Sequence, residues 1–288
     1  IALLSMALFF ATLNYQDLPT PIDDLHRKIS LAELAFALLT GVMFLPAPFT
    51  LTLNGALFLI SPAWSLFNEL MVNLAYAIKG ARAGTKGIAV VLAASAVVLI
   101  FAAFHSGKLH LGFRWHEMYA GMGRVFFSFF AGVLIYRYRK VAMEVRPLLA
   151  TLCLIIVACV LSVPIEDDIR PYYDLLFVLL GWPLLLSICC AIAPGPWVAR
   201  LSDFLGTASY AVYVLHIPLL AWTVFLFPAL TEPEFAIYAG SVFIVVTVLL
   251  SWSLTVYFDQ PVQKRLKRWL KAGASGNNTK ASSLPEGA

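Results

Sequence analysis

The stretch Gly87–Phe104 reads GIAVVLAASAVVLIFAAF and holds no charged side chain. About 20 apolar residues in helical form cross the roughly 30 Å hydrocarbon core of a bilayer. A helix is the expected form because it satisfies its own backbone hydrogen bonds, which lipid cannot do. The stretch therefore predicts a membrane-spanning helix.

Similar apolar runs follow one another along the chain of 288 residues. Hydrophobic residues make up 61% of the chain and charged residues 12%, whereas globular domains hold roughly 45–50% and 25%. This composition predicts an all-α, polytopic integral membrane helical bundle with about eight or nine membrane segments. The apolar runs lie at 1–13, 29–45, 62–78, 87–104, 120–136, 147–163, 174–193, 208–227 and 235–258.

Lys and Arg are unevenly divided between alternate connecting segments, and this predicts the orientation of the bundle. Thirteen of them lie in segments 79–86, 137–146, 194–207 and 259–272, and three lie in 105–119, 164–174 and 228–234. Because cytoplasmic loops carry the excess of Lys and Arg, we expect the first set and the C-terminus to be cytoplasmic, as in a bacterial inner membrane. Residues 46–60 form either a full crossing or a re-entrant segment.

The chain is expected to hold one membrane domain, residues 1–272, and a disordered cytoplasmic tail, residues 273–288. It opens inside an apolar run without an initiator Met, so we expect earlier spans to be missing. The sequence has no Cys/His cluster and no phosphate-binding glycine loop, so neither a metal nor a bound cofactor is predicted. The basic segment Gln263–Lys271 is interpreted as an anchor that contacts anionic membrane lipid, and no nucleic-acid role is expected.

One predicted helix carries a stripe of polar residues at membrane depth. In SYAVYVLHIPLLAW (Ser209–Trp222), residues Ser209, Tyr213 and His216 share one helix face. Polar side chains in a membrane usually face the bundle interior or a wet cavity. We expect His216 to line such a cavity with one donor and one acceptor contact. The alternative is a histidine that only joins two helices.

A second stripe lies in SPAWSLFNELMVNLAYAIKG, where Glu69, Asn73 and Tyr76 share a face. Trp64 and Ser65 lie about one turn earlier. A carboxylate at membrane depth costs roughly 2.5–3.5 kcal/mol at a helix centre on insertion scales, so Glu69 is expected to have a partner or a function. The structural alternative is an ion pair with Arg124.

A third element, GRVFFSFFAGVLIYR, places Arg124, Ser128 and Gly132 on one face. Arg124 is expected near the outer end of its span, and Gly132 is expected to allow a close approach of helices. Tyr213 and Trp64 have a second interpretation, as aromatic residues of the membrane interface.

Taken in order, these motifs resemble the membrane-bound acyltransferase 3 family, whose members acylate cell-envelope sugars. The matching residues are Trp64-Ser65-Leu66 with Glu69, then Arg124 with Phe130 and Gly132. The C-terminal half adds LGTASYAVYVLHIP (Leu205–Pro218) and YFDQPVQKRLKR (Tyr257–Arg268). Asp259 stands where Glu is commoner in the family. The family's first span, with an Arg and a His thought to be the catalytic base, has no counterpart in this sequence.

The resemblance implies an O-acyltransferase that moves an acyl group, expected to be acetyl, from an acyl-CoA donor on the cytoplasmic side. The acceptor would be a hydroxyl of a sugar or envelope glycan. His216, Glu69 and Arg124 are the candidate catalytic residues. Arg124 would hold anionic charge, Glu69 would orient a histidine or bind the acceptor, and His216 would handle a proton or orient a substrate. The candidate substrate-binding residues are Trp64, Ser65, Tyr76, Ser209 and Tyr213.

The alternative function is a proton-coupled transporter or permease, with Glu69, Arg124 and His216 as a relay. Polar residues at the membrane midplane are also typical of transporters. The sequence shows no inverted repeat, which weighs against that alternative.

Overall fold

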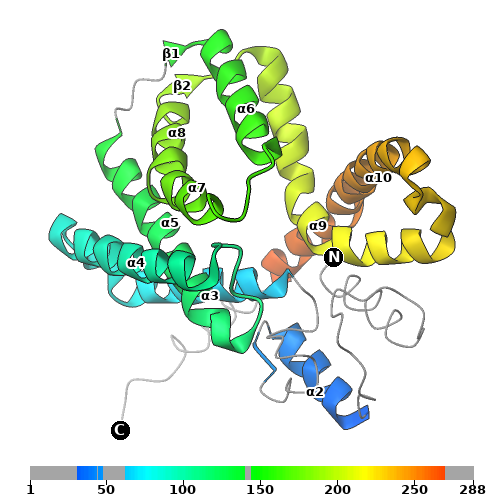
Figure 1. Cartoon of the computed structure of the whole chain (residues 1–288), viewed down its shortest axis with the longest axis horizontal. Coiled ribbons are helices and arrows are strands. Elements are labelled where there is room, and N and C mark those ends of the chain that lie inside the picture. The colour runs from blue at the N-terminus through cyan, green and yellow to red at the C-terminus, as the bar shows by residue number, and fades with distance from the viewer. Residues whose placement is uncertain (1–30, 44, 48–61, 140–143, 270–288) are drawn as a thin grey trace, which may run out of the picture. The chain divides into compact units, whose positions relative to one another are not determined.

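The computed structural model describes residues 31–43, 45–47, 62–139 and 144–269. The chain divides into two compact units, one built from residues 19–202 and the other from residues 1–18 and 203–288. Both are built from helices (Figure 1). The predicted first run at 1–13, the segment 46–60 and the predicted tail at 273–288 fall wholly or mostly outside the described residues.

Among the described residues of the unit 19–202, seven α-helices lie wholly within it, and a π-helical turn at Phe177–Gly181 joins the last two into one continuous rod. Pro147 opens α6 at a position where a missing N–H costs nothing. Gly107 closes α4 in the left-handed conformation, with φ of 71°. The described helices of this unit are α2 (Leu31–Val42), α3 (Ala63–Ile78), α4 (Thr85–Ser106), α5 (Met118–Tyr138), α6 (Pro147–Ser162), α7 (Arg170–Leu176) and α8 (Trp182–Cys189).

One end of this unit gathers exposed basic side chains. The Nη1 of Arg137, at the end of α5, donates to the Ala83 carbonyl before α4 at 2.7 Å. The hydroxyls of Thr85 and Tyr138 are hydrogen-bonded at 2.9 Å. Two short parallel strands, β1 (Glu144–Val145) and β2 (Ile192–Ala193), pair at the connections that lead into α6 and into the next helix. These contacts bring together segments whose Lys and Arg content predicts a cytoplasmic location.

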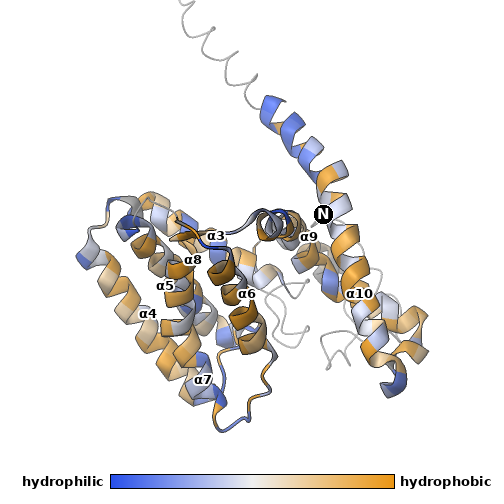
Figure 2. Cartoon of the chain, turned by 90° about the horizontal axis from the view of Figure 1, so that it is seen from above, coloured by the Kyte–Doolittle hydropathy of each residue, from blue (hydrophilic) through white to orange (hydrophobic). Residues whose placement is uncertain are grey.

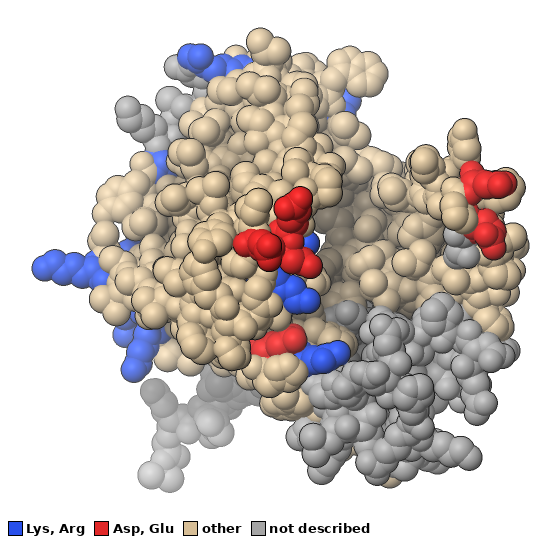
Figure 3. Space-filling view, in the orientation of Figure 1, with Lys and Arg blue, Asp and Glu red and all other residues tan. Residues whose placement is uncertain are grey.

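The opposite end is held by contacts between other connections. The Leu109 N–H donates to Oδ2 of Asp174 in α7 at 2.9 Å. The Tyr173 hydroxyl donates to the Val160 carbonyl near the end of α6 at 2.7 Å. Exposed Glu166, Asp167 and Asp168 lie in the connection between α6 and α7. Figure 3 shows acidic side chains near the middle of the face in view, with basic side chains beside them.

Two long helices make up the described part of the second unit. The helix α9 (Pro196–Leu226) begins before this unit's first residue and has 31 residues, with Pro218 inside it. The helix α10 (Pro233–Leu254) continues through a π-helical turn at Thr255–Asp259 and on to Trp269. A short 3₁₀ helix, Pro228–Thr231, joins α9 to α10.

Five helices of the described residues are long and apolar enough to cross a membrane: Thr85–Ser106, Trp115–Tyr138, Arg170–Cys189, Pro196–Leu226 and Pro233–Trp269. The apolar helix α6 is shorter. Figure 2 shows hydrophobic residues along the middle of these helices, with hydrophilic residues at the connections. The protein is therefore an all-α, integral membrane helical bundle. The count of eight or nine segments stays a prediction, because part of the chain lies outside the described residues.

Many large apolar side chains point outward from these helices. Leu180, Leu184, Ile237 and Ile244 are all more than 60% exposed. Water would not favour so much apolar surface, whereas lipid chains would. The buried core between α4 and α5 is built mostly from Leu, Ala and Phe.

Candidate functional site

A pocket of about 490 Å³ lies between α3 and α5. We call it the α3–α5 pocket. Glu69 and Asn73 of α3 and Arg124 and Ser128 of α5 give it polar walls, and its apolar walls are Val72, Val125 and Phe129. Arg124 lies six residues after Met118, about 9 Å along α5 from its first residue. The structure thus brings Glu69 and Arg124 to one pocket, near the end of α5 opposite the basic end.

Arg124 is held firmly by the connection that precedes its own helix. Its Nη1 donates to the Leu109 carbonyl at 2.8 Å and its Nη2 donates to the Leu111 carbonyl at 3.3 Å. The guanidinium also lies over the ring of Trp64, 5.0 Å from its centroid, which is a cation–π contact. Between described residues, no ion pair joins Glu69 to Arg124. The fixed guanidinium is a rigid part of the pocket wall.

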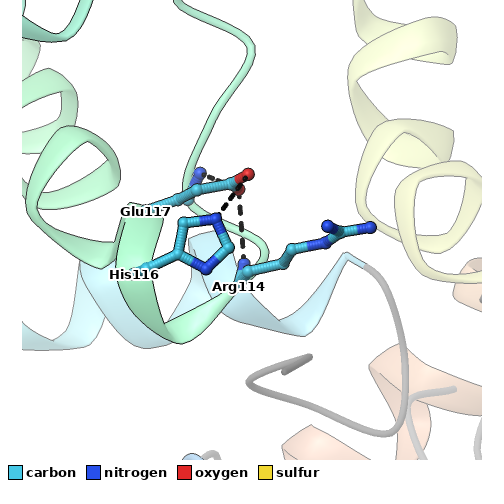
Figure 4. A network of polar contacts seen from close by, with 4 residues as sticks. Arg114, His116 and Glu117 are labelled. Carbon is cyan, nitrogen blue, oxygen red and sulfur yellow. Dashed lines mark hydrogen bonds and ion pairs between the residues drawn. The ribbon is translucent and has the colours of Figure 1, made fainter. Parts of the chain in front are cut away.

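The connection between α4 and α5 is organised around Glu117, as Figure 4 shows. Its Oε2 accepts from the N–H groups of Gly112 at 3.2 Å and Arg114 at 3.4 Å. Its Oε1 lies 3.7 Å from Nε2 of His116. Gly112 has φ of 121°, a conformation that favours glycine. A Cβ there would lie 2.6 Å from the Trp64 ring, so the connection packs tightly over α3.

A histidine of this connection responds to the charges around it. Burial lowers the pKa of His110 from its ordinary value of 6.5, and the nearby cations Arg124, Lys108 and Arg170 lower it further. Glu117 has the opposite, weaker effect. His110 therefore lies among positive charges at this end of the unit, and its neutral form is favoured.

Asn68 is a residue of this region that the sequence analysis did not single out. Its side chain is fully buried, and neither its Nδ2 nor its Oδ1 has a hydrogen-bond partner among the residues that the structure describes. A Cβ on Gly121 would lie 2.9 Å from Asn68 Nδ2 and 3.0 Å from the Trp64 ring. The available signal was its place in the sequence, four residues after Trp64 and thus one turn along the same face.

The glycine expected to allow a close helix approach is not the one that does so. A Cβ on Gly132 would meet no described residue within 4 Å, so that expectation is wrong. In α5 the close contacts are made at Gly121, whose neighbours are Asn68, Trp64 and Gly112, and at Gly123, where a Cβ would lie 2.8 Å from the Val98 side chain. The reason is helix position: Gly121 lies at the level where α3 and the 109–117 connection meet α5, and Gly132 lies about three turns farther along.

Two other candidate residues lie beside the α3–α5 pocket without lining it. The Ser65 hydroxyl donates to the Pro62 carbonyl at 3.2 Å, at the start of α3. The Tyr76 ring packs edge-on against Phe129 and Phe130, with centroid distances of 5.4 and 6.3 Å. A binding role for Ser65, Tyr76 or Trp64 stays a prediction.

The stripe of Ser209, Tyr213 and His216 lines a separate pocket within the second unit, between α9 and α10. This α9–α10 pocket has a volume of about 480 Å³. Ser209, Tyr213 and His216 all line it, so the three residues of the stripe face the same space, and Thr247 lies opposite on α10. The remaining lining residues are apolar: Leu205, Ala208, Val212, Phe243, Ile244 and Val248.

The His216 ring is oriented by its own helix. Its Nδ1 lies 3.0 Å from the Val212 carbonyl oxygen and 2.9 Å from the Tyr213 carbonyl oxygen. Carbonyl oxygens only accept hydrogen bonds, so Nδ1 carries the proton. In a neutral ring the lone pair is then on Nε2, on the side of the ring away from those carbonyls. The Ser209 hydroxyl also donates to its own helix, at the Gly206 carbonyl.

The residues that line both pockets lie within the match of a known family. The sequence profile of that family, described as an acyltransferase domain, matches residues 2–256 and so includes Glu69, Arg124 and His216. The chain belongs to the acyltransferase 3 family. The resemblance inferred from the ordered motifs is thereby confirmed, and with it the interpretation of the chain as a membrane acyltransferase domain.

One curated relative is similar to part of this acyltransferase 3 chain. It is "Protein 2 in picA locus" of Rhizobium radiobacter, 68% identical over 103 residues. These residues are 36% of this chain and 54% of the relative, so the chain spans about half the length of that protein. No solved structure matches the chain significantly.

Proposed function

We propose that this acyltransferase 3 protein moves an acyl group from a cytoplasmic acyl-CoA to a hydroxyl of a sugar or envelope glycan. The observation that carries the proposal is the α3–α5 pocket inside a matched acyltransferase domain. A carboxylate, an amide, a guanidinium and a hydroxyl line this pocket, and together they offer donors and acceptors to a molecule with many hydroxyl groups. The transporter alternative is not favoured by the family.

In this proposal Glu69 is the group that recognises the acceptor. Its side chain is exposed on α3, while the Asn73 amide donates to the Glu69 backbone carbonyl at 2.8 Å. Glu69 lines the pocket, and its carboxyl oxygens can accept a hydrogen bond from a sugar hydroxyl and so align it. Arg124 supplies fixed positive charge to an anionic group or to a developing oxyanion. His216 takes part from the α9–α10 pocket as a group that handles a proton or orients a substrate.

The proposed direction of transfer follows from charge. The end of the unit that holds Arg82, Lys86, Arg137 and Arg146 is the cytoplasmic one under the positive-inside rule. A reporter fused after Lys271 is then cytoplasmic, and one inserted between Asp167 and Asp168 is extracytoplasmic. If both reporters gave the same side, the proposed orientation would be wrong.

The reaction is tested with the protein in proteoliposomes supplied with radiolabelled acetyl-CoA and a panel of sugars and envelope glycans. We expect label to appear in the acceptor as an alkali-labile ester, since O-acyl esters are cleaved by mild base. Uptake of labelled sugar into empty proteoliposomes is measured in parallel. Uptake without ester formation would overturn the proposal and restore the transporter alternative.

A further inference from the structure

The α9–α10 pocket differs in kind from a pocket for a sugar, and we propose that it holds the acyl chain of the donor. This inference rests on the proposed function and adds the class of acyl group to it. Six of the ten lining residues are apolar, and the pocket volume of about 480 Å³ is several times that of an acetyl group. Apolar walls of this kind suit a hydrocarbon chain.

Three of the four polar residues of the α9–α10 pocket, Ser209, Tyr213 and His216, lie along α9, and Thr247 lies on α10. Since Nδ1 of His216 is occupied by the Val212 and Tyr213 carbonyls, the ring has Nε2 left for a ligand. An acyl chain bound against Val212 and Val248 therefore has the His216 ring and the Tyr213 phenol beside it. This is the arrangement required by a reactive acyl carbonyl attached to an apolar chain.

The depth of the pocket along each helix is also consistent with a donor that enters from the cytoplasm. His216 lies ten residues, about 15 Å, before Leu226 at the outer end of α9. Thr247 lies fourteen residues, about 21 Å, after Pro233 at the outer end of α10. From there the same helix runs on to exposed Lys264, Arg265, Lys267 and Arg268. Their positive charge complements the phosphates of a CoA-type donor.

Donor selectivity provides the first test. Acetyl-, butyryl-, hexanoyl- and octanoyl-CoA are compared with the wild-type protein and with Val212→Phe and Val248→Phe, which narrow the pocket from each helix. We expect the wild type to accept chains longer than acetyl. We expect either variant to lower the octanoyl-to-acetyl rate ratio at least ~10-fold, because discrimination per methylene in an apolar pocket is of this order. Val245→Phe, on the exposed outer side of α10, is the matched control.

Direct labelling provides a test that does not depend on transfer. A CoA thioester with a diazirine in its acyl chain should crosslink to peptides of α9 and α10, less so in Val212→Phe. Unlabelled octanoyl-CoA should compete with this labelling. A diazirine phosphatidylcholine that labels the same peptides equally, without competition by acyl-CoA, would overturn the inference in favour of a lipid site. An unchanged rate ratio in both narrowing variants would overturn it as well, and failure of the enzyme itself would appear separately as no ester with any donor.

Discussion

The two pockets of this protein are nearly equal in volume and opposite in chemistry. The α3–α5 pocket has Glu69, Asn73, Arg124 and Ser128 on its walls, and the α9–α10 pocket has mostly Ala, Val, Leu, Ile and Phe. In the first, polar groups are held by a tightly built connection; in the second, His216 is held by its own helix. Under the proposed function, charge would select the ligand of the first pocket and shape the ligand of the second.

The largest effect should come from removing the one carboxylate of the α3–α5 pocket. Glu69→Gln keeps the size of the side chain and removes its charge, so we expect transfer to fall about 1,000-fold, within the range typical of lost acid–base or orienting groups. Membrane abundance should stay near normal, because the Glu69 side chain is exposed in the described structure. Rates are measured with labelled acetyl-CoA and normalised to protein in the membrane.

The matched control is Glu166→Gln, which removes an exposed carboxylate from the connection between α6 and α7. Its rate should equal that of the wild type. If Glu69→Gln lost activity and abundance in parallel, Glu69 would be a structural residue. The polar walls of the α3–α5 pocket would then be no evidence that it binds a sugar.

Substitution of Arg124 tests how much its hydrogen bonds in the wall of the α3–α5 pocket contribute to the stability of the protein. Arg124→Gln leaves the Leu109 and Leu111 carbonyls without their charged donor, so we expect a loss of about 2–3 kcal/mol in the free energy of unfolding. Arg137→Gln, which removes an exposed arginine bonded to one carbonyl, should cost about 1 kcal/mol or less. Thermal unfolding in detergent compares the two variants. Equal losses would mean that the guanidinium is not an anchor.

A pair of glycine variants tests the packing behind the same wall. Gly121→Ala places a Cβ against Asn68, Trp64 and the Gly112 backbone, so we expect a loss of about 1–3 kcal/mol from overpacking. Gly132→Ala meets open space in the same helix and should be neutral or stabilise α5 by about 0.5–1 kcal/mol. The thermal unfolding midpoints of both variants are compared with that of the wild type. A Gly121→Ala protein as stable as the wild type would contradict the close packing at Gly121.

The smallest effect concerns pH. Because the pKa of His110 is lowered in the folded protein, the unfolded chain binds more protons below the ordinary value of 6.5, and stability should fall on acidification. Above that value the contribution vanishes. His110→Gln should remove this part of the acid sensitivity, by about 2 °C or less in the unfolding midpoint between about pH 7.5 and about pH 5.5. Identical pH profiles for both proteins would show that the ring does not sense its cationic neighbours.

Periodicity and charge in the sequence predicted the helices well, because they are the features that a bilayer selects. The apolar run 87–104 predicted the helix α4, which extends from Thr85 to Ser106 and ends before Gly107 in the left-handed conformation. The prediction of a helix over 174–193 was less accurate, because the helix begins at Arg170 and contains a π-helical turn before Trp182. Such a turn depends on packing between helices, and no local pattern encodes it.

The pockets were predictable in part for the same reason. Helical spacing placed Ser209, Tyr213 and His216 on one face, and they line one pocket. The partners of Arg124 were not predictable, because they are backbone carbonyls and every residue has one. Glu69 and His216 lie in different compact units, so the prediction that they are neighbours stays a prediction.

The length of α9 determines how the protein responds to the bilayer around it. Its 31 residues extend over about 46 Å, which exceeds the roughly 30 Å of hydrocarbon. The excess is accommodated by tilt or by extending beyond the lipid on the side of Trp197 and Arg200. Hydrophobic mismatch thus adjusts the depth of His216, and the activity of the protein should depend on the chain length of the lipids in which it is reconstituted.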